Sequence, residues 1–355
     1  MLLVVAAAAW FATPALASFP GGNGRIAFSS NADGDFELFT MNPDGSGRTQ
    51  ITHNSFDEQR MTYFNDVAPK WSPSGDKLLF IQAWSIPALT AVDDLFTVNP
   101  DGTGEQRLFG GGLLADIGWS PDGDRIVLTA CTAFGHGSCF GYNAFTSNRD
   151  ANDFTRLAVN DGRSDLDVDW SPGGDKIAIS DAHDIWIVAA DGSPGVTPLV
   201  TGPALDADPS WSPDGRKLAF TSDRDGNDEI YVVNADGTGQ TRLTHDARFD
   251  GAAAWSPDGR RIAFHRFECN EARCVSNILT MASDGSDEVQ LTSNTLDSGA
   301  AETGPDWQPL PGPQRSDYKN RAQFCKAERA FWGEDGFRAR YGGGANAHGK
   351  CVSSG

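Results

Sequence analysis

The sequence is poor in basic residues, in sulfur-containing residues and in long apolar segments. Its 355 residues include 28 Lys and Arg against 48 Asp and Glu, which gives a net charge of −20 at neutral pH. Because nucleic acids and anionic membranes repel such a chain, we expect no nucleic-acid partner. Only 4 Met and 6 Cys accompany 40 Gly, 19 Pro and 10 Trp. This balance favours an all-β protein with many turns over a helical bundle.

The longest apolar run lies at the N-terminus, between Leu2 and Ala12, and is followed by Ala-Leu-Ala at positions 15–17. A hydrophobic core of about ten residues that ends in A-x-A is typical of a secretory signal peptide. A membrane-spanning helix would need about 18 or more apolar residues. We therefore interpret residues 1–17 as a signal peptide. We expect a secreted, periplasmic or cell-envelope protein that does not span the membrane.

The six cysteines are neighbours in sequence, two by two. Fifteen pairings are possible, but short loops favour Cys131 with Cys139, Cys269 with Cys274, and Cys325 with Cys351. A structural metal site is disfavoured, because no C-x-x-C pair or adjacent His provides the usual ligand spacing. Disulfide bonds agree with an oxidising compartment outside the cytoplasm.

A five-residue motif, Trp-Ser-Pro-x-Gly, recurs through the middle of the chain. Its copies begin at Trp71, Trp119, Trp170, Trp211 and Trp255, and a degenerate sixth begins at Trp307. Such a period indicates a repeated supersecondary unit. Each Ser-Pro-Asp-Gly turn is followed by β-rich runs, as at 217–221, 229–233 and 241–244. With the Trp strand, each repeat has four antiparallel strands, which is the blade of a β-propeller.

The two ends of the repeat region complete each other. Residues 25–52 contain three expected strands without a preceding Trp strand, and residues 304–309 contain a Trp strand without the three that should follow. Joining them gives a sixth blade and removes the open sheet edges. The sequence therefore predicts a six-bladed propeller over residues 18–312, closed by one C-terminal and three N-terminal strands.

The pattern W-S-P-D-G, I-A-F-x-S, I-Y-V-x-N-x-D-G, R-L-T resembles the WD-type repeat of TolB-like six-bladed propellers of the bacterial envelope. The resemblance covers about residues 24–309 and implies the fold much more strongly than a function. It does not extend to the N-terminal α/β domain of TolB, which we expect to be absent.

Acidic residues recur at fixed distances before the Trp residues. Those five positions before are Asp66, Asp165, Asp206, Asp250 and Glu302; Asp116 is near the gap in this row, and Asp167 and Asp208 stand three before their Trp. Because these positions begin the innermost strand, we expect them to surround the mouth of the central channel. Clustered carboxylates there would attract a cation or a basic peptide. The alternative is that they serve strand starts and solubility.

The face opposite the Ser-Pro-Asp-Gly turns should carry the variable loops, including the Cys-flanked hairpins at 131–139 and 269–274. Such loops on a rigid scaffold commonly bind ligands, although they could merely restrain the chain. Asp223, Asp225 and Asn227 alternate in a way that suits calcium. The full twelve-residue calcium loop is missing, so we expect no cofactor.

Catalytic motifs are weak in this sequence. There is no G-x-S-x-G motif, and the six His residues fall in different repeats. We therefore expect an exported, non-enzymatic scaffold, a monomer, that binds a protein or peptide ligand at the acidic mouth and hairpin-loop face. The alternatives are a metal-assisted hydrolase or lyase that uses the same mouth, and an inert structural scaffold.

Residues 313–355 form a separate, basic segment after a Pro-rich boundary. It contains eight Lys and Arg and four Asp and Glu, a net charge of +4, so the remainder carries −24. Helical spacing over 316–332 and the Cys325–Cys351 pair predict a small disulfide-stapled module. It could dock on the propeller or on an anionic cell-wall polymer, or be a solvated appendage.

Overall fold

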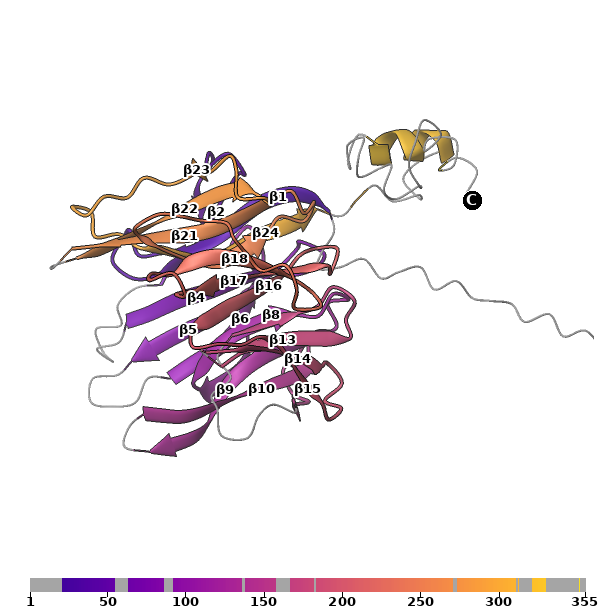
Figure 1. The fold of residues 1–355 in the computed structure, drawn as a ribbon. Helices are drawn as coiled ribbons and strands as arrows, with labels where there is room; N and C mark the ends of the chain where they lie inside the picture. The colour runs from indigo at the N-terminus through magenta and orange to yellow at the C-terminus, as the bar shows by residue number, and fades with distance from the viewer. Residues whose placement is uncertain are drawn as a thin grey trace, which may run out of the picture.

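The computed structural model describes residues 21–54, 63–85, 92–135, 138–157, 167–181, 183–270, 273–310, 312, 321–329 and 351. The expected signal peptide lies outside these residues. The described chain forms six four-stranded antiparallel sheets arranged as a six-bladed propeller (Figure 1). The predicted all-β fold and the number of blades are therefore confirmed.

We number the blades from the first Trp strand. Blade 1 contains β4 (Tyr63–Trp71), β5 (Leu78–Ser85), β6 (Val92–Val98) and β7 (Gln106–Gly112). Blade 2 contains β8 (Leu114–Trp119), β9 (Arg125–Gly135), β10 (Ser138–Asn148) and β11 (Thr155–Arg156). Blade 3 contains β12 (Val168–Trp170), β13 (Lys176–Ser180), β14 (Ile185–Ala189) and β15 (Val196–Val200).

The second half of the ring repeats the plan. Blade 4 contains β16 (Asp206–Trp211), β17 (Lys217–Ser222), β18 (Glu229–Asn234) and β19 (Thr241–Arg242). Blade 5 contains β20 (Phe249–Trp255), β21 (Arg261–Cys269), β22 (Cys274–Ala282) and β23 (Val289–Gln290). Blade 6 joins β24 (Glu302–Leu310) to β1 (Gly22–Ser30), β2 (Glu37–Met41) and β3 (Thr49–Gln50).

The first strand of each blade is innermost. These six strands, β4, β8, β12, β16, β20 and β24, contact one another in ring order and enclose the axis. The first five of these strands end at the Trp that enters the Ser-Pro-x-Gly turn, so these turns gather at one end of the ring, whereas β24 carries Trp307 without such a turn. In the second copy of that turn, the Ser120 carbonyl accepts the Gly123 N–H at 2.9 Å, and Gly123 has a φ of 73°, which glycine adopts without strain.

The hydrophobic core is divided among the six seams between neighbouring blades. In the seam between blades 6 and 1, for example, fully buried Trp71 and Phe80 pack against Ala27, Leu38 and Ile51. Because each blade covers one face of the next, no blade buries its apolar surface alone. Blade 6 closes the ring through β24, where Ile26 pairs with Trp307.

A β-bulge interrupts each inner strand for which the pairing extends far enough to show it. On β4, Asp66 pairs with Gln82 and Trp71 pairs with Leu78, so five steps on β4 face four on β5. The same five-against-four mismatch occurs on β8, β16, β20 and β24. An extra residue moves every earlier side chain to the other face of the strand. This shift decides which acidic side chains reach the channel.

The three predicted disulfides are present, Cys131–Cys139, Cys269–Cys274 and Cys325–Cys351. The first two join the hairpins β9–β10 and β21–β22 in opposite blades. Residues 321–329 are helical and include Cys325, which confirms the described part of the C-terminal helix and its staple. Within the described residues, no helix is long and apolar enough to cross a membrane.

Candidate functional site

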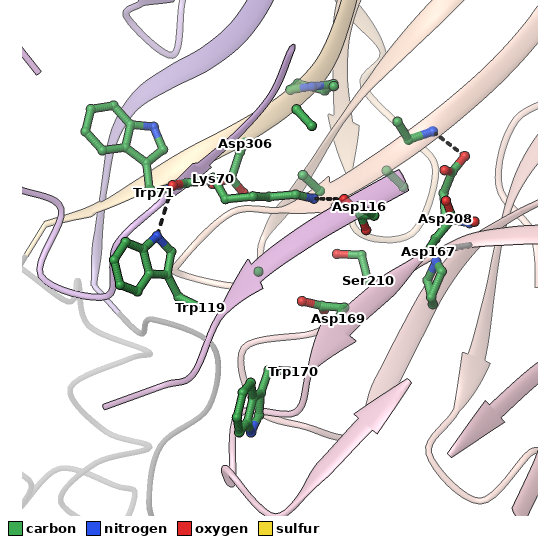
Figure 2. A pocket seen from close by; sticks show the side chains of 18 of the residues that line it. Lys70, Trp71, Asp116, Trp119, Asp167, Asp169, Trp170, Asp208, Ser210 and Asp306 are labelled. Atoms are coloured by element: carbon green, nitrogen blue, oxygen red, sulfur yellow. Dashed lines mark hydrogen bonds and ion pairs between the residues drawn. The ribbon is translucent and has the colours of Figure 1, made fainter. Parts of the chain in front are cut away.

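A cavity of about 310 Å³ lies on the axis of the ring and is lined by residues of all six inner strands. Its charged lining consists of one cation and five carboxylates: Lys70, Asp116, Asp167, Asp169, Asp208 and Asp306. Figure 2 shows the Lys70 side chain directed at Asp116, with Asp167 and Asp208 adjacent to each other farther from Trp71, Trp119 and Trp170. We call these five carboxylates the channel acids.

The channel acids occupy two levels along the axis. At the level three positions before each Trp, blades 2 to 4 contribute acids and the other three blades contribute small residues: Asp116, Asp167 and Asp208 face Ala252, Gly304 and Ala68. The level one position before each Trp contains Lys70, Asp169 and Asp306, with Gly118, Ser210 and Ala254. The first level is therefore acidic on one half of the ring. On the other half it carries only small, uncharged residues.

Each channel acid also connects its blade to the next one. Innermost strands have an unpaired inner edge, and its N–H groups need acceptors. The accepting contacts are Asp116 from Val168 N–H at 3.0 Å, Asp167 from Asp208 N–H at 3.3 Å, Asp208 from Ala252 N–H at 3.2 Å, Asp169 from Trp211 N–H at 2.6 Å, and Asp306 from Trp71 N–H at 2.6 Å. One oxygen of each channel carboxylate thus joins two neighbouring blades by a hydrogen bond.

Burial and mutual repulsion make several channel acids hard to ionise. Burial raises the pKa of Asp167 to about 7, and the charges of Asp208 and Asp116 add to the effect. Burial raises the pKa of Asp169 to about 7 and that of Asp306 to about 6. It also raises the pKa of Asp116, although Lys70 opposes the shift. The channel therefore gains negative charge as the pH rises from about 6 to 7.

Lys70 is the one cation in the described lining of the cavity. Its Nζ lies 3.9 Å from an oxygen of Asp116. Burial opposes its charge, but Asp116 and Asp306 together hold its pKa above the ordinary value. One ammonium group facing five carboxylates leaves the channel with an excess of negative charge above pH 7.

The sequence placed Asp116, Asp167 and Asp208 at the channel, and the structure brings these three together there. The same expectation is wrong for Asp66, Asp206, Asp250 and Glu302, whose residues are 0% exposed and do not line the cavity. The bulge is the cause, because it turns the side chain five positions before Trp onto the face that carries the Trp. Asp165 lies outside the described residues.

These four acids, which we call the seam acids, are held between blades by donors. Asp206 accepts from Arg224 Nη2 at 2.8 Å, and Asp250 accepts two bonds from Arg266 at 2.6 and 2.8 Å. Glu302 pairs with Arg48. Asp66 differs, because its donors are the neutral amides of Gln82 at 3.0 Å and Asn54 at 2.6 Å.

Sequence reasoning missed Lys70, Asp169 and Asp306. The available signal was alternation, because residues one and three positions before Trp face the same side of a regular strand. Acids recur in the sequence at five and three positions before Trp, and Lys70, one position before Trp71, departs from that sign of charge. The channel therefore contains three more charged side chains than the sequence pattern indicated, and they form a second level one position before Trp.

The proposed calcium ligands do not converge on a common point. The Asp223 carboxylate accepts the Leu205 N–H at 2.8 Å, Asp225 pairs with Arg242 at 3.2 Å, and the Asn227 amide donates to the Asp246 carbonyl at 3.0 Å. Among the residues that the structure describes, no group of three or more His, Cys, Asp or Glu side chains is arranged to hold a metal ion.

Comparisons with known proteins agree with this architecture. Residues 162–309 match the family described as the TolB beta propeller domain. The structure is similar to TolB from Acinetobacter baumannii, with a TM-score of 0.63 and 18% identity over 82% of this chain and 67% of that one.

Two other structures show the same likeness. A protein described as TolB from Agrobacterium tumefaciens gives a TM-score of 0.58 and 20% identity over 81% of this chain and 100% of that one. A chain of a nidogen–laminin complex gives 0.60 and 11%, over 80% of this chain and 98% of that one. No curated protein matches the sequence significantly. Residues 162–309 thus match the TolB beta propeller domain family, and residues 21–310 form a six-bladed β-propeller similar in fold to that of TolB.

Proposed function

We propose that this protein is an exported, non-enzymatic scaffold that binds a protein or peptide ligand through a basic side chain in the acidic channel. Three disulfides support an oxidising location outside the cytoplasm. The observation that carries the binding proposal is the excess of channel acids, five carboxylates around Lys70 in one cavity. A Lys or Arg side chain of a ligand would supply the missing positive charge.

The hairpin-loop face is the proposed side of approach. From that face, the first level of channel side chains is the one three positions before Trp, with Asp116, Asp167 and Asp208 on one half. The other half contains Ala68, Ala252 and Gly304, which leave room for the backbone of an extended segment. From the turn-rich face, a ligand would first meet the level one position before Trp, which contains the cation Lys70.

A direct test measures binding of a tetralysine peptide at pH 8 by calorimetry. The channel variant is Asp116→Asn, Asp167→Asn and Asp208→Asn together, because Asn keeps an acceptor oxygen for the N–H of the next blade. We expect at least tenfold weaker binding than in the unmodified protein. Retention of full affinity by the channel variant would contradict the proposal.

The matched control removes the same charge elsewhere. Asp101, Asp236 and Asp284 stand in exposed Asp-Gly turns on the turn-rich face. Changing all three to Asn should leave tetralysine affinity unchanged at 150 mM salt, since exposed charges at a distance are screened. An equal loss in both variants would show that net charge, and not the channel, attracts the peptide.

The natural ligand is sought by cross-linking on intact cells, with identification of the adducts. Adducts on the hairpins 131–139 and 269–274 are expected for a ligand that enters from the hairpin-loop face. Adducts confined to the Ser-Pro-Asp-Gly turns would reverse the side of approach.

A further inference from the structure

Two seams of the ring are built to the same plan but differ in charge. In the seam between blades 4 and 5, Glu229 of β18 and Asp250 of β20 are both 0% exposed. In the seam between blades 6 and 1, Glu37 of β2 and Asp66 of β4 occupy the same positions and are equally buried. Each seam thus encloses two carboxyl groups.

Cations neutralise the first seam. Arg266, which pairs with Asp250 across the strands, bonds it with two N–H groups, and Arg242 Nη2 lies 2.6 Å from Glu229. In the second seam, Gln82 occupies the position of Arg266 and is neutral. Within the described part of the chain, neither Glu37 nor Asp66 has a cation at ion-pair distance.

Neutral donors meet all four carboxyl oxygens of the second seam. Glu37 accepts from the Thr52 hydroxyl at 2.5 Å and from the Asn54 backbone N–H, and Asp66 accepts from Gln82 and the Asn54 side chain. A metal ion would have to displace these donors. The Thr52 hydroxyl donates to Glu37 and also lowers the pKa of Asp66, so with a proton on Glu37 it can accept from Glu37 and turn its own hydrogen toward Asp66.

We propose that Glu37 and Asp66 share one proton through Thr52 and that loss of this proton to water loosens the seam between blades 6 and 1. The O–H bond of the carboxyl group breaks, the proton passes to solvent, and two carboxylates remain buried without a cation. Isolated buried charges are expensive, and the cost is lowest if the seam opens to water. Burial raises the pKa of Glu37 to about 8 and that of Asp66 to about 6, in agreement with one shared proton at neutral pH.

The other charged and titratable groups around the pair add net negative charge to its surroundings. These are Asp35 on the β1–β2 hairpin, His53 on the link after β3, Asp94 of β6 with its partner Arg107 of β7, and Glu105 in the turn before β7. Asp35 and Glu105 add negative charge. The positive charge of Arg107 is already paired with Asp94 at 2.8 Å.

The test compares pH dependence in the full protein and in two variants, Glu37→Gln and Gln82→Arg. Because the folded pKa of Glu37 exceeds its unfolded value, the stabilisation is complete below about pH 4.5 and is lost as the pH rises to about 8. Between pH 6 and pH 8 the unfolding constant of the unmodified protein should rise at least tenfold more than that of Glu37→Gln. Gln82→Arg, which imports the cation of the other seam, should flatten the profile in the same way. Parallel profiles in all three would overturn the proposal.

The matched control is Glu229→Gln, at the same position of the cation-rich seam. It should weaken the fold by a similar factor at pH 6 and pH 8, because at both values Arg242 loses Glu229 and keeps only the exposed Asp225. The link after Asn54 contains Arg60, so Arg60→Ala is included. If that variant abolished the pH dependence, the proton would belong to a pair involving Arg60 and the proposal would fail.

Two measurements that do not depend on unfolding detect the shared proton and the opening of the seam. At pH 7 the infrared band of protonated carboxyl groups should be weaker by one group in Glu37→Gln than in the unmodified protein, while the contribution of Asp167 and Asp169 remains in both. Hydrogen exchange should report loosening at the Asp66 N–H, which donates to the Phe36 carbonyl at 2.7 Å across the seam. Protection there should fall at pH 9 in the unmodified protein and persist in Glu37→Gln; unchanged protection in both would contradict the loosening.

Discussion

On β16 the seam acid Asp206 and the channel acid Asp208 stand two residues apart, but seam acids and channel acids have different surroundings. Asp250 is fully buried and held by the two-pronged contact of Arg266. Asp208, on the neighbouring inner strand, is only partly buried and accepts from Thr221 and a backbone N–H. Seam acids accept from donors of their own blade or of an adjoining link, whereas channel acids accept from N–H groups of the next blade. Channel acids exceed their cations, which costs stability and leaves charge for a ligand.

The largest expected effect comes from breaking a seam. Arg266→Ala leaves Asp250 buried without its cation, which should lower the free energy of unfolding by about 3–5 kcal/mol. Urea unfolding at pH 7 measures the loss. Arg216→Ala is the control, because the Arg216 side chain is 85% exposed and should change stability undetectably. Equal effects of the two substitutions would remove the distinction between a structural seam and the surface.

The pH dependence of ligand binding should reveal the channel acids. Asp167, Asp169 and Asp306 have raised pKa values of about 7, 7 and 6, so they are largely neutral at pH 5 and ionised at pH 8. Tetralysine affinity should therefore rise at least tenfold between these pH values, while the peptide keeps its charge. Calorimetry at both values measures the change, and constant affinity would contradict a role for these acids.

Lys70→Met should show how much the charge of the channel cation contributes to stability, compared with the cations of the seams. The Lys70 side chain is 37% exposed, so solvent screening limits the expected destabilisation to about 1 kcal/mol at pH 8. At pH 5 the effect should be smaller, because Asp169 and Asp306 are then largely protonated while Asp116 remains 3.9 Å from Nζ. Thermal unfolding at the two pH values measures both. A loss of the same size at pH 5 would indicate packing by the Lys70 stem instead of its charge.

The smallest expected effect has the opposite sign. Asp169→Asn keeps an acceptor for the Trp211 N–H but removes a charge that burial disfavours. Because the folded pKa exceeds the unfolded one, ionisation costs stability as the pH rises to about 7 and above. The variant should gain about 0.5 kcal/mol at pH 8 and nothing at about pH 3, which is below both pKa values. Destabilisation at pH 8 would place Asp169 among the structural acids.

The fold was predictable because its signals are local and repeated. Trp-Ser-Pro-x-Gly specifies a strand end and a turn at each copy, and the unmatched strands at 25–52 and 304–309 required each other. The channel was only partly predictable. Period-two alternation assigns Asp208 to the channel but also Asp206, and the bulge between them separates the two. Nothing in the sequence marks that bulge, since Ala68, Asp208 and Ala252 adopt positive φ without glycine.

The partners of the seam acids were also beyond sequence reasoning. Arg48 meets Glu302 across the closure of the ring, with almost the whole chain between them. Arg224 and Arg266 lie closer in sequence to Asp206 and Asp250, yet only the strand pairing brings them together. Charge balance in a propeller is therefore a property of the closed ring, which a residue-by-residue reading does not contain.

The joining of β24 to β1 also sets the order of events during synthesis. The strands β1 to β3 are made first but lack their inner neighbour until Glu302–Leu310 has emerged. During that interval β1 presents an open edge, the kind of template on which nascent chains aggregate. Blades 1 to 5 are synthesised completely before β24, so they can assemble while the β1–β3 fragment still lacks its inner strand. A chain interrupted before β24 keeps one unprotected sheet edge. The ring is therefore protected from edge-to-edge aggregation only when the last strand has been made.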